Sequence, residues 1–344
     1  MVMTDPLARY WGILEGRSKA SYLLLRSHDV EFDTTRSTDE LWDIHRKEMD
    51  RFRRGEHPDS HATNLLDLKE EIAKRIMRSC QFCERRCRVD RTEGKRGHCG
   101  VLEPRISSEF IHRGEEPPLV PSYTIFFAGC TFDCVFCQNY DISTDPDAGI
   151  SFEPEVLADR IERRFEPTSI GRYSIIEKAR NVNWVGGDPT PNLPYVLTVL
   201  RECRANIPQV WNSNMYLTPE SMAILDGVID LYLTDFKYGN DECAERLSNA
   251  ARYWEVATRN HIEAYRQADI IVRHLVLPNH VECCSHPILE WLADNMPKAL
   301  VNVMAQYRPV HRAKEHRDIS RHLRNDEYLA ALSRARDLDL HLVI

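Results

Sequence analysis

The feature that most constrains the fold is an alternation of short apolar runs with longer amphipathic runs, from about residue 120 to the C-terminus. The apolar runs are rich in β-branched and aromatic residues, as expected of strands buried on both faces. We expect strands at 123–127, 182–185, 209–212, 229–234, 270–277, 300–306 and 338–343. We expect helices between them at 153–164, 194–206, 219–227, 241–249, 253–268, 287–295 and 325–337. This repeat predicts a parallel sheet with right-handed crossovers, closed into a full or partial (β/α) barrel.

Composition excludes several classes of protein. The chain of 344 residues has 45 basic and 53 acidic side chains, hence a net charge of −8, which disfavours nucleic acid as a partner. It has no apolar run of about 18 residues, so no membrane span is expected. Residues 1–26 lack the compact apolar core of a secretory signal. We therefore expect a cytoplasmic protein with no membrane partner.

The chain is expected to have three parts. Residues 1–79 are charged and contain apolar residues at helical spacing, which predicts a helical N-terminal extension packed on the main domain. Residues 80–120 begin with a cysteine-rich segment and are expected to form a small metal-binding lobe. Residues 121–344 are expected to form the barrel domain.

The chain has 11 cysteines, and seven of them fall in two tight groups, which in a reducing compartment indicates metal binding or catalysis. The first group has the spacing C-x2-C-x3-C-x11-C and consists of Cys80, Cys83, Cys87 and Cys99. Four thiolates can close a tetrahedral zinc site or fill every position of an iron–sulfur cluster. A structural zinc is the simpler interpretation and an auxiliary cluster is the alternative. The four scattered cysteines are interpreted as structural or incidental: Cys203, Cys243, Cys283 and Cys284.

The second group, Cys130, Cys134 and Cys137, follows the first predicted strand with the spacing C-x3-C-x2-C. A [4Fe–4S] cluster needs four ligands, so three close thiolates leave one iron open for another molecule. In α/β folds the C-terminal ends of strands are where active sites are built. A zinc knot, or a cluster completed by a distant cysteine, is the alternative from spacing alone.

Five ordered segments carry a resemblance to a known family. They are 114–118 (GEEPP), 126–143 (FFAGCTFDCVFCQNYDIS), 235–238 (DFKY), 273–278 (RHLVLP) and 306–309 (QYRP). The chain resembles the radical S-adenosylmethionine (SAM) superfamily, and within it a branch similar to pyruvate formate-lyase activating enzymes. The aromatic residue expected before the last cysteine is Phe136. The resemblance implies a partial barrel whose open iron is chelated by SAM, with cleavage to methionine and a 5′-deoxyadenosyl radical.

The resemblance also implies a set of SAM-binding residues at the ends of the later strands. Gly186, Gly187 and Asp188 match a motif that holds the SAM amino group, although the family usually has glutamate in the third position. Thr190 belongs to the same turn. The remaining candidates are Asn212, Asn214, Asp235, Lys237 and Arg273. Arg273 lies in an apolar strand and needs an anion, which by resemblance is the SAM carboxylate.

The expected function is therefore reductive SAM cleavage followed by hydrogen abstraction from a substrate. By resemblance the substrate is a glycine of a glycyl-radical-type partner protein, and the electron donor is a low-potential protein of the flavodoxin or ferredoxin type. A small molecule or peptide as substrate is the first alternative. A metal-binding scaffold without radical chemistry is the second.

Overall fold

A computed structural model describes residues 5–56, 62–165 and 178–343 of the chain. Within these residues one sheet runs in the order β1-β2-β3-β4-β5-β6-β7-β8 and does not close on itself. Its strands are β1 (Ile106–His112), β2 (Ser122–Phe127), β3 (Asn181–Gly186), β4 (Gln209–Ser213), β5 (Leu231–Asp235), β6 (Asp269–Leu275), β7 (Leu300–Met304) and β8 (His341–Leu342). Neighbours from β2 to β8 are parallel, and β1 is antiparallel to β2. The predicted partial (β/α) barrel is confirmed.

The helices follow the predicted alternation closely. In the barrel they are α5 (Tyr140–Ser143), α6 (Pro154–Phe165), α7 (Leu193–Glu202), α8 (Pro219–Leu225), α9 (Asp241–Ser248), α10 (Tyr253–Gln267), α11 (His286–Asn295) and α12 (Asn325–Asp337). Local chemistry sets several of the boundaries. At α8, for example, the Thr218 hydroxyl accepts a hydrogen bond from the Ser221 N–H, and Pro219 occupies the first helical position.

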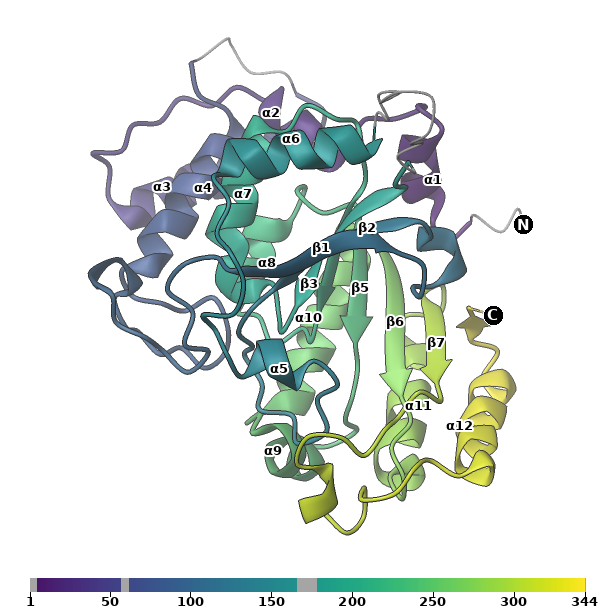
Figure 1. Ribbon diagram of the computed structural model, residues 1–344. Coiled ribbons are helices and arrows are strands. Elements are labelled where there is room, and N and C mark those ends of the chain that lie inside the picture. The colour runs from purple at the N-terminus through teal and green to yellow at the C-terminus, as the bar shows by residue number, and fades with distance from the viewer. Residues whose placement is uncertain (1–4, 57–61, 166–177, 344) are drawn as a thin grey trace, which may run out of the picture.

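The N-terminal extension is helical, as expected, and packs on the barrel. It contains α1 (Ala8–Leu14), α2 (Ser21–Arg26), α3 (Thr38–Arg53) and α4 (Leu65–Met77). Helix α4 contacts α7, and Figure 1 shows α2, α3 and α4 grouped beside α7 at one end of the sheet. Among the residues that the structure describes, no helix combines the length and apolarity needed to cross a bilayer.

Strand β1 and the short helix α5 were not predicted from the sequence, and α1 and α2 were expected only as part of a helical extension without bounds of their own. In β1 the apolar residues are interrupted by Ser107, Ser108 and Glu109, and most of the strand is only half-buried, so the apolar run that marks the other strands is absent. β1 lies within 80–120, yet it extends the sheet by pairing with β2. The division into a lobe and a barrel at residue 120 stays a prediction.

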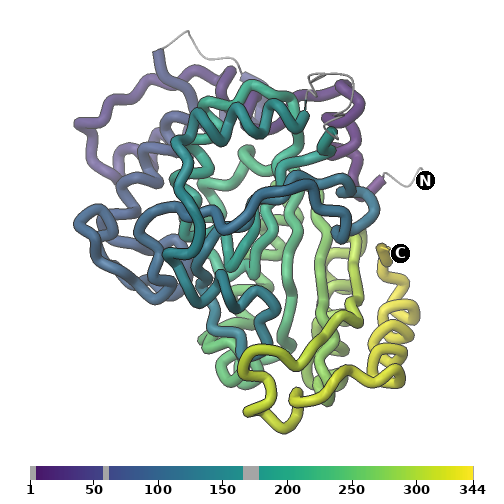
Figure 2. Tube along the Cα trace, viewed as in Figure 1, coloured from purple at the N-terminus to yellow at the C-terminus, as the bar shows by residue number. Residues whose placement is uncertain are grey.

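Helix α1 fills the N-terminal end of the barrel interior. Side chains from α1, from the loop before β2 and from the first half of the central strands form one buried apolar cluster: Leu7, Tyr10, Leu119, Val210, Leu231, Leu233 and Ile271. The tube in Figure 2 shows the purple helix α1 and the yellow end of the described chain at this end of the molecule, where Val343 also packs on the cluster. This end of the interior is thus closed by apolar side chains, with the Asn181 amide donating to the Tyr10 hydroxyl among them.

Candidate functional site

The loop after β2 brings the three predicted cluster cysteines together. Cys130, Cys134 and Cys137 lie between β2 and α5, at the C-terminal edge of the parallel strands. In Figure 1, α5 and α9 lie at this end of the sheet, below the arrowheads of the central strands. Cys130 is buried and interacts electrostatically with both other thiols, and Cys134 does so with Cys137. The grouping expected from the spacing is therefore present in three dimensions.

Cys130 has polar donors directed at its sulfur. The Phe132 N–H donates to Cys130 Sγ over 3.4 Å, and the Asn214 amide lies 3.8 Å from the same sulfur. The amide nitrogen of Asn214 also donates to Thr131 Oγ1 at 2.9 Å. Donors of this kind stabilise negative charge on sulfur. Asn214 thus contacts the cysteine loop itself, although it was predicted as a SAM-binding residue.

The other two sulfurs also have hydroxyl partners. The Ser248 hydroxyl, at the end of α9, donates to Cys134 Sγ over 2.9 Å. Cys137 Sγ lies 3.4 Å from the Ser143 hydroxyl of α5. Lys237 interacts electrostatically with Cys134, and its ammonium pairs with the Asp235 carboxylate. Neither serine was identified from the sequence. Ser143 lies only six residues after Cys137, whereas Ser248 is 114 residues from Cys134 and comes near the loop only through the tertiary fold.

Burial raises the pKa of four of the cysteine thiols, two in each group. It raises the pKa of Cys134 to about 12, although the Lys237 ammonium and the Ser248 hydroxyl act in the opposite direction. Burial likewise raises the pKa of Cys130, Cys83 and Cys99. Thiols must lose their protons to bind a metal, so any metal held by these cysteines would displace protons on binding.

The glycine pair after β3 allows the backbone to approach the cysteine loop. A Cβ at Gly187 would lie 2.1 Å from the Gly129 carbonyl oxygen, and one at Gly186 would lie 2.1 Å from the Phe127 carbonyl oxygen. The Gly187 N–H donates to that Phe127 oxygen at 2.8 Å. We expected the pair to permit close approach of a ligand. In the structure the chain that approaches is the segment that carries Cys130.

Asp188 is buried and accepts hydrogen bonds from its own neighbourhood. One carboxylate oxygen accepts from the Thr190 N–H at 2.9 Å, and the other accepts from the Ser213 hydroxyl and the Asn214 N–H at 3.0 Å each. Burial raises the pKa of Asp188, and these hydrogen bonds act against that rise. The carboxylate therefore ties the end of β3 to the end of β4. Its predicted contact with the SAM amino group stays a prediction.

Arg273 on β6 holds two carboxylates of the chain. Its Nε and Nη2 each donate to one oxygen of Glu116 at 2.7 Å, and Nη2 also pairs with Glu115. The Asn302 amide donates to Glu116 at 2.8 Å. The anion that a buried guanidinium requires is thus supplied by the loop before β2. The contact of Arg273 with the SAM carboxylate stays a prediction. Glu115 and Glu116 were known from the sequence only as part of a motif, and the structure places both at the site.

Three polar residues share the barrel interior with Arg273. Asp235 is the cross-strand neighbour of Arg273, and Asn212 is buried on the next strand over. The side-chain nitrogen of Asn183 on β3 donates to Glu115 at 3.0 Å, while its side-chain oxygen Oδ1 is buried without a hydrogen-bond partner. An interior with buried polar atoms that lack partners is suited to a polar ligand.

The N-terminal cysteine group lies against the three-cysteine loop. Cys83 interacts electrostatically with Cys80, Cys87 and Cys99, so the four thiols are neighbours. A Cβ at Gly129 would lie 3.1 Å from the Cys99 carbonyl oxygen, which shows how closely the two segments approach.

Two polar contacts join the same segments. The Arg85 guanidinium donates to the Thr131 carbonyl at 3.1 Å, and the His98 ring is 3.1 Å from the Asp133 carboxylate. The lobe thus supports the loop from outside the barrel.

Comparison with known proteins assigns this arrangement to a family. The family model described as the Radical SAM superfamily matches residues 124–292, which include the three-cysteine loop and strands β3 to β6. The chain belongs to the radical SAM superfamily. Membership of this superfamily implies an enzyme that uses a [4Fe–4S] cluster, SAM and a low-potential reductant.

One curated relative matches nearly the whole chain. The uncharacterized protein MJ0674 of Methanocaldococcus jannaschii is 45% identical over 347 aligned residues, covering 98% of this chain and 99% of the relative. The N-terminal extension and cysteine lobe of this radical SAM protein are therefore part of the matched length.

Solved structures are similar at a lower level. SuiB of Streptococcus suis, bound to the precursor peptide SuiA, matches with TM-score 0.42 and 13% identity over 62% of this chain and 46% of SuiB. This chain thus spans less than half of SuiB. Methylornithine synthase matches with TM-score 0.44 and 12% identity over 97% of this chain and 78% of the synthase. QueE from Escherichia coli matches with TM-score 0.38 and 14% identity over 71% of this chain and 94% of QueE.

Proposed function

We propose that this radical SAM protein holds a [4Fe–4S] cluster on Cys130, Cys134 and Cys137 and cleaves SAM reductively. The observation that supports this most is the convergence of the three thiols at one edge of the sheet, each with a hydrogen-bonding partner, from the loop itself, from α9 and from α5. When bound, the cluster supplies an electron to SAM, giving methionine and a 5′-deoxyadenosyl radical that removes a hydrogen atom from the substrate. The proposed electron donor is a flavodoxin- or ferredoxin-type protein.

The chain's own residues have separate parts in this proposal. Lys237 offsets the negative charge of the thiolates, because its ammonium interacts with both Cys134 and Cys130. Phe136 packs against the Tyr307 ring, with centroids 5.8 Å apart, and screens the loop from water on that side. We propose that SAM is bound in the barrel interior between this loop and the interior polar residues at the ends of the strands.

The proposed SAM contacts are those of the sequence analysis. They are Phe136, Gly186, Gly187, Asp188, Thr190, Asn212, Asn214, Asp235, Lys237 and Arg273. Asn212 and Asp235 are well placed to bind SAM, because both lie on strands that face the barrel interior. The Asn214 amide, in contrast, is already directed at the Cys130 sulfur.

For the N-terminal group we propose an auxiliary iron–sulfur cluster in preference to zinc. One zinc ion needs ligand atoms about 4 Å apart or closer. Among the described residues, the one group of three or more metal-binding side chains whose ligand atoms come within 4.8 Å of one another lies elsewhere in the chain. The thiols of Cys80, Cys83, Cys87 and Cys99 are neighbours, but no three of their sulfurs all lie within 4.8 Å of one another, which suits ligands of separate irons.

For the substrate we propose a glycine in a loop of a partner protein. The sheet is open between β1 and β8, and the apolar cluster around α1 blocks the opposite end, so a substrate must enter from the side of the cysteine loop. A small molecule or peptide bound in the interior is the other outcome that the test below separates.

The test uses protein purified without oxygen, dithionite and SAM. Wild type is expected to release 5′-deoxyadenosine, and Cys134→Ala is expected to release none and to lose about four irons per chain. Cys203→Ser is the matched control, because Cys203 is buried next to Tyr22, away from both groups. Equal cleavage by Cys134→Ala and wild type would contradict the proposal. Stimulation of cleavage by small-molecule fractions of a cell extract, and none by protein fractions, would reject the protein substrate.

A further inference from the structure

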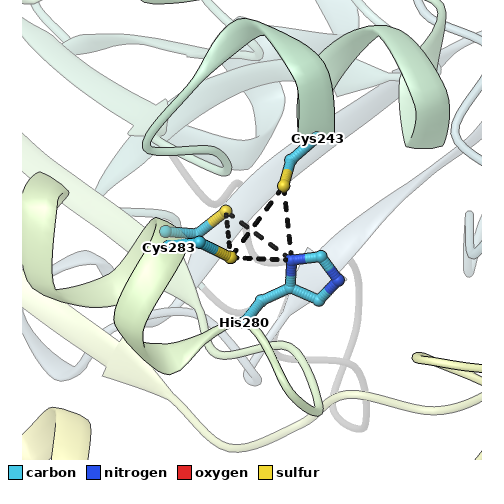
Figure 3. A group of neighbouring side chains, drawn as sticks. Cys243, His280 and Cys283 are labelled. Carbon is cyan, nitrogen blue, oxygen red and sulfur yellow. Dashed lines mark hydrogen bonds between the residues drawn. The ribbon is translucent and has the colours of Figure 1, made fainter.

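Three cysteines and a histidine outside the radical SAM site converge on one point. Cys243 comes from the first turn of α9, and His280, Cys283 and Cys284 come from the segment between β6 and α11. Figure 3 shows the three sulfurs directed at one ring nitrogen of His280. From the sequence these cysteines were interpreted as structural or incidental. Cys243 is far from the others along the chain. The spacing of His280, Cys283 and Cys284 was the available signal.

The distances match the edges of one small tetrahedron. His280 Nδ1 lies 3.5 Å from Cys243 Sγ, 3.3 Å from Cys283 Sγ and 3.8 Å from Cys284 Sγ. Cys283 Sγ lies 3.9 Å from each of the other two sulfurs. A tetrahedral zinc with Zn–S of about 2.3 Å and Zn–N of about 2.0 Å places its sulfurs about 3.8 Å apart and sulfur and nitrogen about 3.5 Å apart.

His280 is oriented as a metal-binding histidine would be. Its other ring nitrogen, Nε2, lies 2.8 Å from Asp318 Oδ2. A proton on Nε2, donated to this carboxylate, leaves the Nδ1 lone pair facing the sulfurs. Carboxylates hold the remote nitrogen of zinc-bound histidines in the same way. Arg246 fixes the carboxylate in turn, because its two terminal nitrogens donate to the two Asp318 oxygens at 3.2 and 2.6 Å.

The backbone around the cluster is built to bring the two segments together. The Asn240 side chain caps α9 by accepting from the Cys243 N–H at 2.8 Å, and its amide donates to the Cys283 carbonyl at 2.8 Å. A Cβ at Gly239 would lie 2.6 Å from that same carbonyl oxygen, so only glycine permits the approach. Residues Val281–Ser285 form a turn of π-helix, a rare conformation that is frequent at functional sites.

We propose that Cys243, His280, Cys283 and Cys284 bind one zinc ion in a closed, structural site. Binding forms three Zn–S bonds and one Zn–N bond and releases the thiol protons, with no change of oxidation state. All four positions are filled by the protein, so the ion has no open position for a substrate.

The zinc would stabilise the radical SAM loop through α9. Cys243 lies at the start of this helix, and Ser248 at its end donates to Cys134 Sγ. The Leu247 and Ser248 carbonyls also accept hydrogen bonds from the N–H groups of Val135 and Asp133, at 2.9 and 3.1 Å. An ion that links α9 to the segment after β6 would therefore fix the end of α9, which the cysteine loop contacts.

The test is the zinc and iron content of anaerobically purified full-length protein, measured by mass spectrometry. His280→Ala and Cys243→Ser are each expected to lose one zinc per chain relative to wild type while iron is unchanged. The control Cys203→Ser is expected to keep all metal. Cobalt added to the wild-type protein after zinc removal is expected to give the visible absorption of a tetrahedral thiolate site, absent in His280→Ala.

A second measurement keeps the proposal falsifiable if a variant folds poorly. Hydrogen exchange in α9 is expected to accelerate on zinc removal from wild type and to slow again on zinc addition. Equal zinc in wild type and both variants would overturn the proposal. So would loss of iron in place of zinc, or two thiols of wild type recovered as a disulfide. Failure of SAM cleavage with this zinc retained would count only against the proposed function.

Discussion

The ion pair of Arg273 with Glu115 and Glu116 offers the sharpest test of the site. The Arg273 side chain is 14% exposed, and those of Glu115 and Glu116 are 6% and 2% exposed. Arg273→Met would leave the buried Glu116 carboxylate without a cation and the buried Glu115 carboxylate with only the His112 ring, at 3.2 Å. Breaking a buried pair in this way costs about 3–5 kcal/mol of the free energy of unfolding.

The expected shift follows from chain length. An unfolding entropy of about 2.1 cal/mol/K per residue makes 1 kcal/mol equivalent to about 1.4 °C in a chain of 344 residues. Arg273→Met should therefore lower the unfolding temperature by about 4–7 °C, measured anaerobically by calorimetry without SAM. The unfolding temperature of Arg273→Lys should lie between those of wild type and Arg273→Met, because lysine keeps the charge and loses the two-point contact with Glu116.

Two further variants complete this test. Arg266→Met removes a surface arginine whose partner Glu263 is 3.7 Å away, and it should change the unfolding temperature by less than about 1 °C. Adding Glu116→Gln to Arg273→Met should recover part of the loss, because one unpaired charge is removed. If Arg273→Met unfolds at the wild-type temperature and only weakens SAM binding, the guanidinium serves SAM and the ion-pair reasoning is refuted.

Two other predictions concern the glycine pair and a buried lysine. Gly187→Ala should cost about 1–3 kcal/mol of stability and reduce the iron content per chain, because its Cβ would lie 2.1 Å from the Gly129 oxygen. Gly114→Ala is the control, since its Cβ would meet only the His112 ring, at 3.1 Å. Equal iron content in the two variants would contradict this prediction. Burial lowers the pKa of Lys69 to about 7, from 10.5. Between those values the unfolded chain binds more protons than the folded one, so wild-type stability should rise with pH relative to Lys69→Met, by at most about 1.4 kcal/mol per pH unit. Denaturant unfolding at pH 7 and pH 9 measures this, and parallel curves would reject it.

The sequence by itself determined the architecture of the barrel. Seven strands and the helices between them were predicted because a strand buried on both faces must be a continuous apolar run, and the helices carry their own caps, as Thr218 does for α8. β1 was missed because Ser107, Ser108 and Glu109 interrupt its apolar residues, a pattern that is more typical of a loop. The spacing of Cys130, Cys134 and Cys137 was informative for a similar reason, because ligands within one loop are close whatever the rest of the chain does.

Tertiary structure alone decided the partners of those residues. Ser248 approaches Cys134 from a distant segment, and nothing in its local context marks it. Glu115 and Glu116 lie in a recognisable motif, but only the fold pairs them with Arg273, more than 150 residues away. Only the fold brings Cys243 to His280, Cys283 and Cys284, because α9 and the segment after β6 follow neighbouring strands of the sheet. Spacing along a chain specifies contacts within a turn or loop, whereas contacts between loops depend on the order and register of the strands that carry them.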